Sequence, residues 1–333
     1  MVTIVDVARK ARVSKATVSR FINNKGFISI KLQNRIKEAI NELDYRPNLI
    51  ARSLKIRKTY SIGIIYPDIE DPFFSRIIKK IEDTAYENNY SVILCNTEYD
   101  SLKEKIYFDV LKRKMVDGYI IFTTINDEDY LASVLKNENV VFLDRSPKLE
   151  KEVFIKLNNI KSTKLAVEYL INLGHKRIGI IMGPMKITTG IERFKGYKIS
   201  LLENNIEFDK KLVKFAGSSI RNARNKTIEL ISKNKNKPTA IIATNTSTTL
   251  GLLIAIKDMN IKIPNEISII GFDKLMYYSL IKPSLTVIEQ PVDKFGIMAC
   301  RVLIDIINGK KIKNKIFELE PKLLIGDSCA KID

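Results

Sequence analysis

The stretch "SKATVSRFIN", residues 14–23, combines a polar, cationic face with an apolar one at helical spacing. Val18, Phe21 and Ile22 recur at i, i+3 and i+4 and therefore share one face. The opposite face has no acid and consists of Lys15, Ala16, Ser19, Arg20 and Asn23. An arginine there can fork onto guanine O6 and N7 or hold a phosphate, and small residues at the helix N-terminus can reach base edges. These residue types suit the DNA major groove, although a solvated helix in a small bundle is an equal alternative from periodicity alone.

A second group of polar side chains follows apolar, strand-like runs. Carboxylate, amide and guanidinium groups can chelate hydroxyls, and an aromatic pair supplies a stacking surface, so their convergence would make a small-molecule pocket. Each residue alone could also be a turn cap or a surface charge. The candidates are Asp68, Phe73 and Phe74 after the first run, Asp144 and Arg145 in "VVFLDR", Arg193 in "ERFKGY", Asn245 in "AIIATN" and Asp273 in "IIGFD".

Three short helices are predicted in the first 46 residues. Thr3, Ser14 and Ser29 are the predicted N-caps. Apolar stripes run through Ile4, Val7, Ala8 and Ala11, then through the stretch quoted above, and then through Leu32, Ile36, Ala39, Ile40 and Leu43. The first two helices are separated by about three residues, which is typical of a helix-turn-helix whose second helix reads DNA. Thr17 and Asn23 suit phosphate oxygens.

The segment "YRPNLIARSLKIRK", residues 45–58, is a hinge or a basic linker. Pro47 favours a helix start, but the helix from Asn48 to Leu54 is barely two turns and is marginal in water by itself. If it becomes helical only on DNA, Leu54 is placed to wedge between base steps in the minor groove. Ala51 and Lys55 belong to the same candidate contact set.

Residues 60–333 alternate strand-like and helical patterns. Most of the strand-like runs are continuously apolar and β-branched, which is typical of parallel strands buried on both faces. Two open parallel sheets with flanking helices fit this length, and ligands in such folds bind beyond the carboxyl ends of the strands. The expected strands span residues 61–66, 90–96, 117–123, 140–144, 176–183, 240–245 and 267–273.

The charge of the chain is concentrated near its N-terminus. Residues 1–60 contain 14 Lys and Arg but four Asp and Glu, a net +10 of the total +18. A concentrated basic segment favours a polyanion partner. Neither a signal peptide nor a transmembrane run is expected, and the three cysteines lie far apart, so we expect a cytoplasmic protein with reduced thiols and without a metal or other cofactor.

Ordered motifs extend through nearly the whole chain. "TIVDVARKARVSKATVSRFINN" and "ELDYRPNLIARSL" resemble the DNA-binding and hinge regions of the lac repressor/galactose repressor family of bacterial transcription regulators. "IGIIYPDIEDPFF", "LINLGHKRIGII", "ERFKGY", "IPNEISIIGFD" and "PSLTVIEQP" also resemble that family. The departures from the family pattern are Arg12 in place of glycine, Asn158-Asn159 in place of Asp-Asn, Asn245-Thr246 in place of Asn-Asp, and Ser218 where some members place an aromatic.

The resemblance implies a helix-turn-helix domain (1–46), a hinge helix (47–58) and a two-lobed, periplasmic-binding-protein-like α/β core (59–333). The expected N-lobe covers about 60–158 plus 290–320, and the C-lobe about 159–289 plus 321–333. It implies a homodimer, without a tetramerising tail, that represses transcription from a pseudo-palindromic operator under control of an effector, by default a sugar. The DNA-binding candidates are Thr3, Ser14, Lys15, Ala16, Thr17, Ser19, Arg20, Asn23, Asn48, Ala51, Leu54 and Lys55.

Three other interpretations stay open at this point. In the first, the effector is a nucleobase or a protein corepressor instead of a sugar. The second, a carbohydrate-active enzyme, is disfavoured because no nucleophile, phosphate-loop or metal motif occurs and the single histidine, His175, directly precedes a strand. An Asp144/Asp273 carboxylate pair is the remaining catalytic candidate. An architectural DNA-binding protein without a ligand would not need the converging polar groups.

Overall fold

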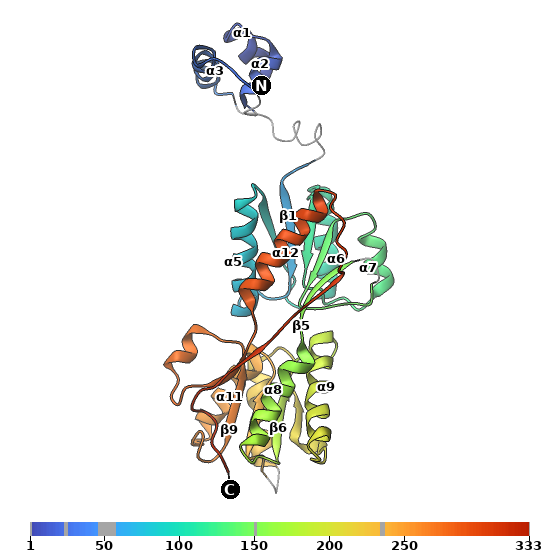
Figure 1. The fold of residues 1–333 in the computed structure, drawn as a ribbon, viewed down its shortest axis with the longest axis vertical. Helices are drawn as coiled ribbons and strands as arrows, with labels where there is room; N and C mark the ends of the chain where they lie inside the picture. The colour runs from blue at the N-terminus through green and yellow to red at the C-terminus, as the bar shows by residue number, and fades with distance from the viewer. Residues whose placement is uncertain (1, 23–25, 46–57, 150–151, 234–236, 333) are drawn as a thin grey trace. The chain divides into compact units, whose positions relative to one another are not determined.

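The chain forms two compact units, Met1–Thr59 and Tyr60–Asp333 (Figure 1). The computed structural model describes residues 2–22, 26–45, 58–149, 152–233 and 237–332. The predicted hinge helix therefore lies outside the described residues, as do the candidates Asn23, Asn48, Ala51, Leu54 and Lys55. Within the described ranges, no helix combines the length and the apolar character needed to cross a membrane.

The first unit contains the three helices that the apolar stripes predict. They are α1 (Ile4–Lys10), α2 (Lys15–Ile22) and α3 (Ile30–Glu42). Val7, Val18 and Ile36, one from each helix, are fully buried against one another in a small core. The Ser14 hydroxyl accepts a hydrogen bond from the Thr17 backbone N–H (3.1 Å), as expected of an N-cap, whereas Ser29 precedes α3 without a side-chain capping bond.

The turn between α1 and α2 carries a strained residue. Arg12 has φ +50°, a left-handed conformation that glycine adopts without steric cost and that other residues adopt at a cost of about 1–2 kcal/mol. An arginine from α3 supports this turn, because Arg35 Nη2 donates to the carbonyl of Ala11 at 2.6 Å. The left-handed conformation of Arg12 therefore lowers the stability of the first unit relative to glycine at this position. The hydrogen bond from Arg35 of α3 partly offsets that loss.

The N-lobe of the second unit is built on a six-stranded parallel sheet in the order β11-β5-β4-β3-β1-β2. Helices α5 (Pro72–Glu87) and α12 (Val292–Ile307) pack together on one face, and α6 (Ser101–Arg113) and α7 (Glu128–Val134) contribute to the core on the other (Figure 1). Its strands are β1 (Ser61–Tyr66), β2 (Ser91–Asn96), β3 (Gly118–Ile121), β4 (Val140–Leu143), β5 (Val153–Leu157) and β11 (Ile316–Leu319).

The C-lobe repeats this plan with the sheet order β12-β10-β9-β8-β6-β7, in which only β12 runs antiparallel to its neighbour. Alternate strand residues face two cores, one with α8 (Asn159–Asn172) and α9 (Thr188–Glu203), the other with α10 (Ile220–Ser232) and α11 (Thr246–Asp258). Its strands are β6 (Ile178–Met182), β7 (Val213–Phe215), β8 (Ala240–Ala243), β9 (Ser268–Phe272), β10 (Thr286–Glu289) and β12 (Lys322–Leu324).

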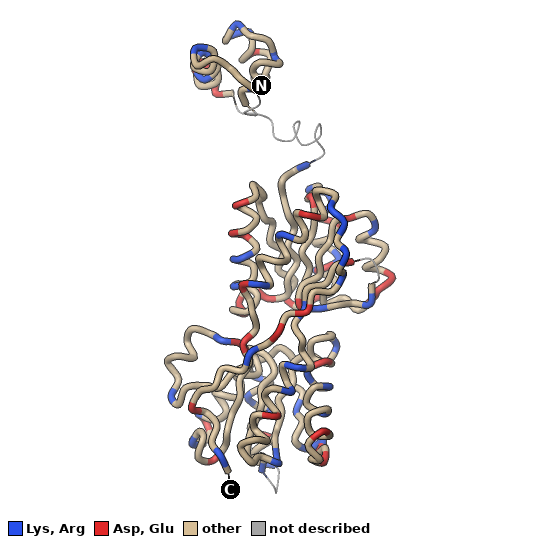
Figure 2. Tube along the Cα trace, viewed as in Figure 1, with Lys and Arg blue, Asp and Glu red and all other residues tan. Residues whose placement is uncertain are grey.

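The chain passes between the two sheets three times. One passage separates β5 from α8, the second separates β10 from α12, and the third joins β11 to β12. The charged residues of the core are interspersed over both lobes (Figure 2). The observed architecture confirms the predicted fold class, and all seven expected strands occur.

Five strands of the structure are not among those that the sequence predicts: β5, β7, β10, β11 and β12. They are three to five residues long, and four of them carry a Lys or Glu within the strand, at Lys156, Lys214, Glu318 and Lys322, while Glu289 ends the fifth. Short segments that contain a charge do not show the continuous apolar pattern that marks a strand buried on both faces.

Candidate DNA-binding face and effector pocket

The polar face of α2 is open to solvent. Lys15, Ala16 and Arg20 are exposed, whereas Val18 on the opposite side is fully buried. The helix contains no acidic residue, so its exposed face has no negative charge of its own. The Ser14 and Thr17 hydroxyls lie 2.8 Å apart at its N-terminus, beside backbone N–H groups that favour anions.

The other described DNA-binding candidates lie at the edges of this face. Ser19, next to Arg20, is half-buried. Thr3 is exposed at the start of α1, where its backbone N–H and its hydroxyl both donate to the Asp6 carboxylate (2.9 and 2.7 Å). These hydrogen bonds lower the pKa of Asp6. Thr3 is therefore already engaged in capping, whereas Lys15 and Arg20 of α2 are exposed.

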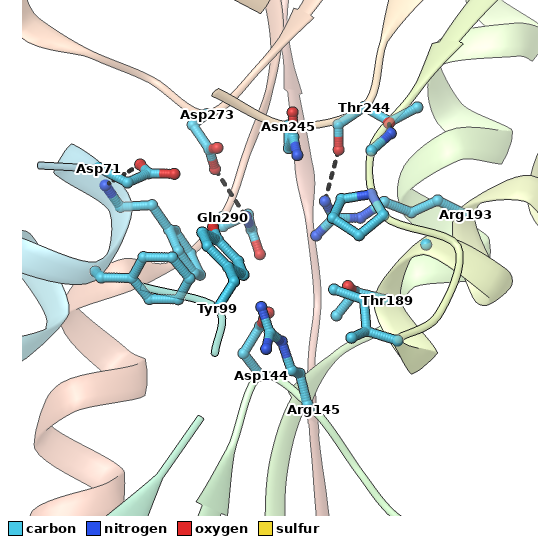
Figure 3. A pocket seen from close by; sticks show the side chains of 16 residues that line it. Asp71, Tyr99, Asp144, Arg145, Thr189, Arg193, Thr244, Asn245, Asp273 and Gln290 are labelled. Atoms are coloured by element: carbon cyan, nitrogen blue, oxygen red, sulfur yellow. Dashed lines mark hydrogen bonds and ion pairs between the residues drawn. The ribbon is translucent and has the colours of Figure 1, made fainter. Parts of the chain in front are cut away.

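A polar pocket lies between the two lobes of the core (Figure 3). It encloses about 500 Å³, counting space open to solvent, and is formed largely where strands of both sheets end. Its lining consists of Asp71, Phe73, Phe74, Tyr99, Asp144, Arg145, Gly183, Pro184, Ile187, Thr189, Gly190, Arg193, Thr244, Asn245, Asp273 and Gln290.

Seven of the eight predicted pocket residues line this cavity, and Asp68 does not. Asp68 turns back on its own loop, because its Oδ1 accepts from the Glu70 backbone N–H (2.9 Å). Asp71, three residues later, occupies the pocket wall instead. As the N-cap of α5 it accepts from the Phe73 N–H (2.9 Å), and that contact fixes which carboxylate of the loop faces the cavity.

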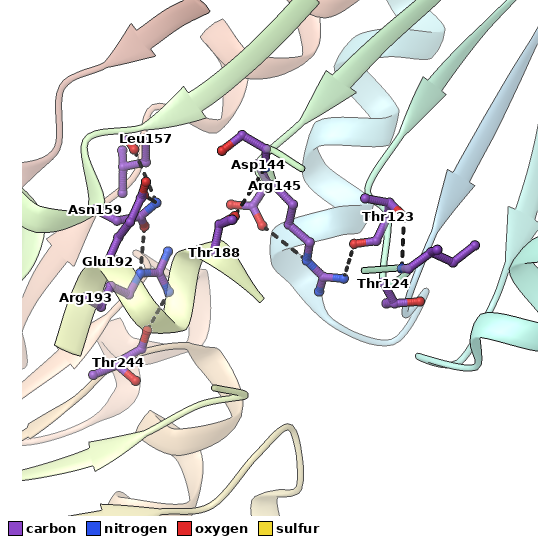
Figure 4. Close-up of polar contacts among 12 residues, drawn as sticks. Thr123, Thr124, Asp144, Arg145, Leu157, Asn159, Thr188, Glu192, Arg193 and Thr244 are labelled. Atoms are coloured by element: carbon purple, nitrogen blue, oxygen red, sulfur yellow. Dashed lines mark hydrogen bonds and ion pairs between the residues drawn. The ribbon is translucent and has the colours of Figure 1, made fainter. Parts of the chain in front are cut away.

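Arg193 is held rigidly within the C-lobe (Figure 4). Its Nε donates to Asn159 Oδ1 (2.8 Å), its Nη1 donates to the Thr244 carbonyl (2.6 Å), and its guanidinium carbon lies 4.0 Å from the centroid of the Phe272 ring. Burial lowers its pKa, and the carboxylates of Asp144 and Asp273 oppose that shift. The side chain is thus positioned before any ligand arrives.

Arg145 occupies the N-lobe side of the same cavity. Its Nη1 donates to the Thr123 carbonyl at 2.8 Å (Figure 4). Its guanidinium carbon lies 5.6 Å from the centroid of the Tyr99 ring. Asp144 lies next to it, with 4.0 Å between Asp144 Oδ2 and Arg145 Nε. Burial raises the pKa of Asp144, while Arg193 and Arg145 counteract this.

Asp273 is the acid of the C-lobe wall. Its two oxygens accept from the Thr246 hydroxyl (2.8 Å) and from Gln290 Nε2 (2.7 Å), yet burial still raises its pKa. Burial raises the pKa of Asp71 to about 7, and the nearby Asp273 charge adds to that rise. The carboxyl group of Asp71 is therefore much more readily protonated than an exposed aspartate.

Asp144 and Asp273 share an unusual backbone conformation. Asp144 has φ +67° directly after β4, and Asp273 has φ +66° directly after β9. Aspartate tolerates this left-handed region better than most residues, but it is uncommon outside glycine and is often found at functional sites. The two strands also hold the same place in their respective sheets.

Three buried polar atoms of the pocket have no hydrogen-bond partner among the described residues: Asp144 Oδ1, Arg145 Nε and Gln290 Oε1. A buried polar group without a partner costs about 1–3 kcal/mol, so such groups are normally satisfied by something. These two acceptors and one donor belong to residues that line one cavity, and groups of this kind are complementary to a ligand that presents hydroxyl groups.

Sequence reasoning missed the pocket residues Asp71, Tyr99, Thr189, Thr244 and Gln290. Gln290 follows the unpredicted strand β10, and recognising that strand would have identified it. Thr244 precedes the predicted Asn245 by one residue and contributes its backbone carbonyl to Arg193. Asn245 both lines the pocket and caps α11, accepting from the Thr248 N–H (2.8 Å).

Within the core, the departures from the family pattern lie around the pocket, not in its lining. Asn158 caps α8 by accepting from the Lys161 N–H (3.0 Å), and neither it nor Ser218 is part of the lining. Thr246 lies behind Asp273 and donates to it. A carboxylate at position 246 would place a like charge at hydrogen-bond distance from Asp273, so the threonine favours the charged form of that aspartate.

His175 lies away from this cavity. It is buried, its Nδ1 is 2.9 Å from the Thr239 hydroxyl, and its Nε2 is 3.1 Å from the Ala330 carbonyl. These contacts tie the C-terminal segment to the C-lobe, which is a packing role. Across the described ranges, no cluster of three or more His, Cys, Asp or Glu side chains is arranged to hold a metal.

Comparison with known proteins identifies both units. Residues 3–48 match the model of "bacterial regulatory proteins, lacI family", and residues 59–321 match "periplasmic binding proteins and sugar binding domain of LacI family". The transcriptional repressor PurR of Aliivibrio salmonicida is 33% identical over all of both chains, and the transcriptional regulator RegA of Clostridium acetobutylicum is 36% identical over 98% of this chain and 99% of its own. A lac repressor dimer bound to operator and an anti-inducer superposes with a TM-score of 0.88, at 26% identity over 99% of both chains.

Proposed function

This chain belongs to the LacI family of bacterial regulatory proteins, and we propose that it is a sequence-specific transcriptional repressor whose operator affinity is set by a sugar bound in the pocket between its lobes. The observation that carries the effector part is the set of unpartnered buried atoms on Asp144, Arg145 and Gln290. The exposed, acid-free face of α2 carries the DNA-binding part.

The DNA-binding proposal rests on the side chains available on α2. Arg20 is long enough to reach base edges from an exposed helix face, and Lys15 and Ala16 lie where the helix N-terminus approaches a groove. The similar lac repressor structure is a dimer on its operator. We therefore propose that two copies of this chain read a pseudo-palindrome, with Leu54 of each hinge inserted in the central minor groove.

We propose that the dimer interface covers apolar side chains that are exposed on the core. On the N-lobe, Leu102 and Ile106 of α6 are 68% and 59% exposed. On the C-lobe, Met276, Leu280 and Ile325 are 91%, 84% and 67% exposed. A contiguous apolar patch marks an interaction surface, whereas single exposed apolar side chains do not. Sedimentation of the full chain should give a dimer if these side chains are buried between two copies.

A sugar fits the pocket better than an anion does. Three carboxyl groups, on Asp71, Asp144 and Asp273, surround the cavity together with two guanidinium groups. Arg193 and Arg145 each already donate to protein acceptors. An added negative charge would face these acids, whereas hydroxyls can donate to Asp144 Oδ1 and Gln290 Oε1. Tyr99 and Phe73 supply the apolar wall that a ring needs.

A thermal-melt screen tests the effector. A ligand present at 100 times its Kd stabilises the folded state by about 2.7 kcal/mol, so sugars, sugar phosphates, sugar acids and nucleobases can be compared directly. We expect a neutral sugar to raise the melting temperature selectively and to change the affinity for an operator selected from a random DNA library. Selective stabilisation by a nucleobase would show that the effector is a nucleobase and not a sugar. If no operator can be selected, the proposal of a sequence-specific regulator is wrong.

A further inference from the structure

An apolar shelf adjoins the polar pocket. It is formed by loops that follow β6 and β7, and it consists of Gly183, Pro184, Met185, Lys186, Phe215 and Gly217. Gly183 and Pro184 line both the shelf and the pocket, so the two surfaces are continuous. Apart from the exposed Lys186 at its edge, the shelf presents no charged side chain.

The centre of this shelf is an aromatic ring held with one side open. Phe215 ends β7 and is 51% exposed. Its ring packs edge-to-face on Phe194, with 5.9 Å between the centroids, and that contact fixes the ring without covering it. Gly217 has φ +69°, and a Cβ added there would meet no atom within 4 Å, so the space beside the ring is open.

We propose that the shelf is a second ring subsite and that the effector is a disaccharide or a longer saccharide. This inference rests on the proposed sugar effector. The first ring presents its hydroxyls to Asp144 and Gln290 in the pocket, and the second lays a face of C–H groups on Phe215. The face of an aromatic ring is negative, so it attracts the partly positive C–H hydrogens of a sugar while both surfaces leave water.

The shelf supplies an aromatic side chain close in the sequence to position 218, where this chain has serine. Ser218 lies outside the lining, and Phe215 is the aromatic that the shelf offers beside the pocket on this side. Because Phe215 lines the shelf and not the polar pocket, we assign its contact to a ring next to the one that the acids hold. The position of the aromatic therefore favours an extended ligand over a single ring.

The composition of the chain supplies a clean reporter, since it contains no tryptophan. The Phe215→Trp variant places a single indole on the shelf. Phe208→Trp is a matched control, because Phe208 is 41% exposed and also packs edge-to-face on Phe194 (6.2 Å) but is not part of the shelf. Both full-length variants are titrated with maltose, cellobiose, lactose and sucrose and with their constituent monosaccharides, after the unmodified protein has been screened by thermal melting with the same compounds.

We expect one disaccharide to bind roughly tenfold or more tightly than either of its monosaccharides, from the area that the second ring buries. It should shift the emission of the Phe215→Trp variant to the blue, whereas saturating monosaccharide and the Phe208→Trp variant should show no shift. Phe215→Ala should reduce disaccharide affinity to that of the monosaccharide and leave monosaccharide affinity unchanged.

Two other results separate the two ways in which the proposal can fail. If a monosaccharide binds as tightly as every disaccharide that contains it, and the indole on the shelf does not respond, the second subsite is refuted while the sugar effector stands. If none of the saccharides stabilises the protein, the sugar effector itself fails, and the subsite fails with it.

Discussion

Replacing Asp71 by asparagine should remove a large part of the pH dependence of the core's stability. Burial and the Asp273 charge raise the pKa of Asp71 from 3.8 to about 7 in the folded protein. Since the unfolded chain loses this proton near pH 4, the folded state holds one more proton between about pH 4 and pH 7. The contribution of Asp71 to the free energy of unfolding is therefore fully present below pH 4 and is lost as the pH rises through 7.

The size of the effect follows from the shift. One pKa unit corresponds to 1.36 kcal/mol, so the whole interval is worth about 4 kcal/mol, and the part between pH 5.5 and pH 8 about 2 kcal/mol. The Asp71→Asn substitution introduces little new strain, because asparagine is as good an N-cap as aspartate and can accept the same hydrogen bond from the Phe73 N–H.

The assay is urea unfolding of the full chain at several pH values, followed by tyrosine emission, since all but one of the 13 tyrosines lie in the core. Between pH 5.5 and pH 8, the free energy of unfolding of the unmodified protein should fall by about 2 kcal/mol more than that of the Asp71→Asn variant. Asp144 and Asp273 are present in both proteins, so the difference between the two curves reports the titration of Asp71 together with its electrostatic coupling to Asp273. Asp100→Asn, at the N-cap of α6, controls for loss of a capping carboxylate. Parallel curves for Asp71→Asn and the unmodified protein would refute the role of Asp71 as a buried group that holds a proton.

Four further outcomes are expected. Arg20→Ala should lose about 1–3 kcal/mol of discrimination at one operator base pair in anisotropy assays; equal weakening on all sequences would make Arg20 a phosphate contact. Arg12→Gly should stabilise the first unit by about 0.5–1 kcal/mol by calorimetry, and Arg12→Ala, which removes the charge but keeps the strained φ, should not. Asp144→Asn should weaken effector binding by roughly tenfold to a hundredfold in calorimetric titration, the cost of one charge-assisted hydrogen bond, and unchanged affinity would exclude it as a contact. Leu54→Ala should weaken operator binding and leave effector binding intact. Unchanged operator affinity would show that Leu54 does not insert between base steps.

The sequence predicts the pocket best where a polar residue directly follows a strand without charged residues. Asp144 and Asp273 are identifiable because β4 and β9 are continuous apolar runs, and the last residue of such a run points to the strand end where ligands bind. Gln290 follows β10, a four-residue strand ending in Glu289, and that weaker pattern does not mark it.

Other parts of the site depend on contacts between elements that are distant in the chain. The choice between Asp68 and Asp71 is made by local capping geometry, since both carboxylates belong to the same loop. The position of Arg193 depends on Asn159 and on the Thr244 carbonyl, which come from a different helix and a different loop. Spacing along one strand or helix cannot specify such meetings, because they are set by the order of strands in the sheet.

The equivalence of Asp144 and Asp273 has a consequence for how ligand preference can diverge. Each acid follows the third strand of its sheet, and each has the same left-handed backbone conformation. The two acids therefore occupy equivalent positions in the two lobes. Each acid has a partner in its own lobe, Asp273 in Thr246 and Asp144 in Arg145, but the charge of Arg193 in the C-lobe also acts on Asp144. A substitution that removes one of these charges is therefore expected to change the pKa of the acid in the other lobe, so the two halves of the pocket do not vary independently.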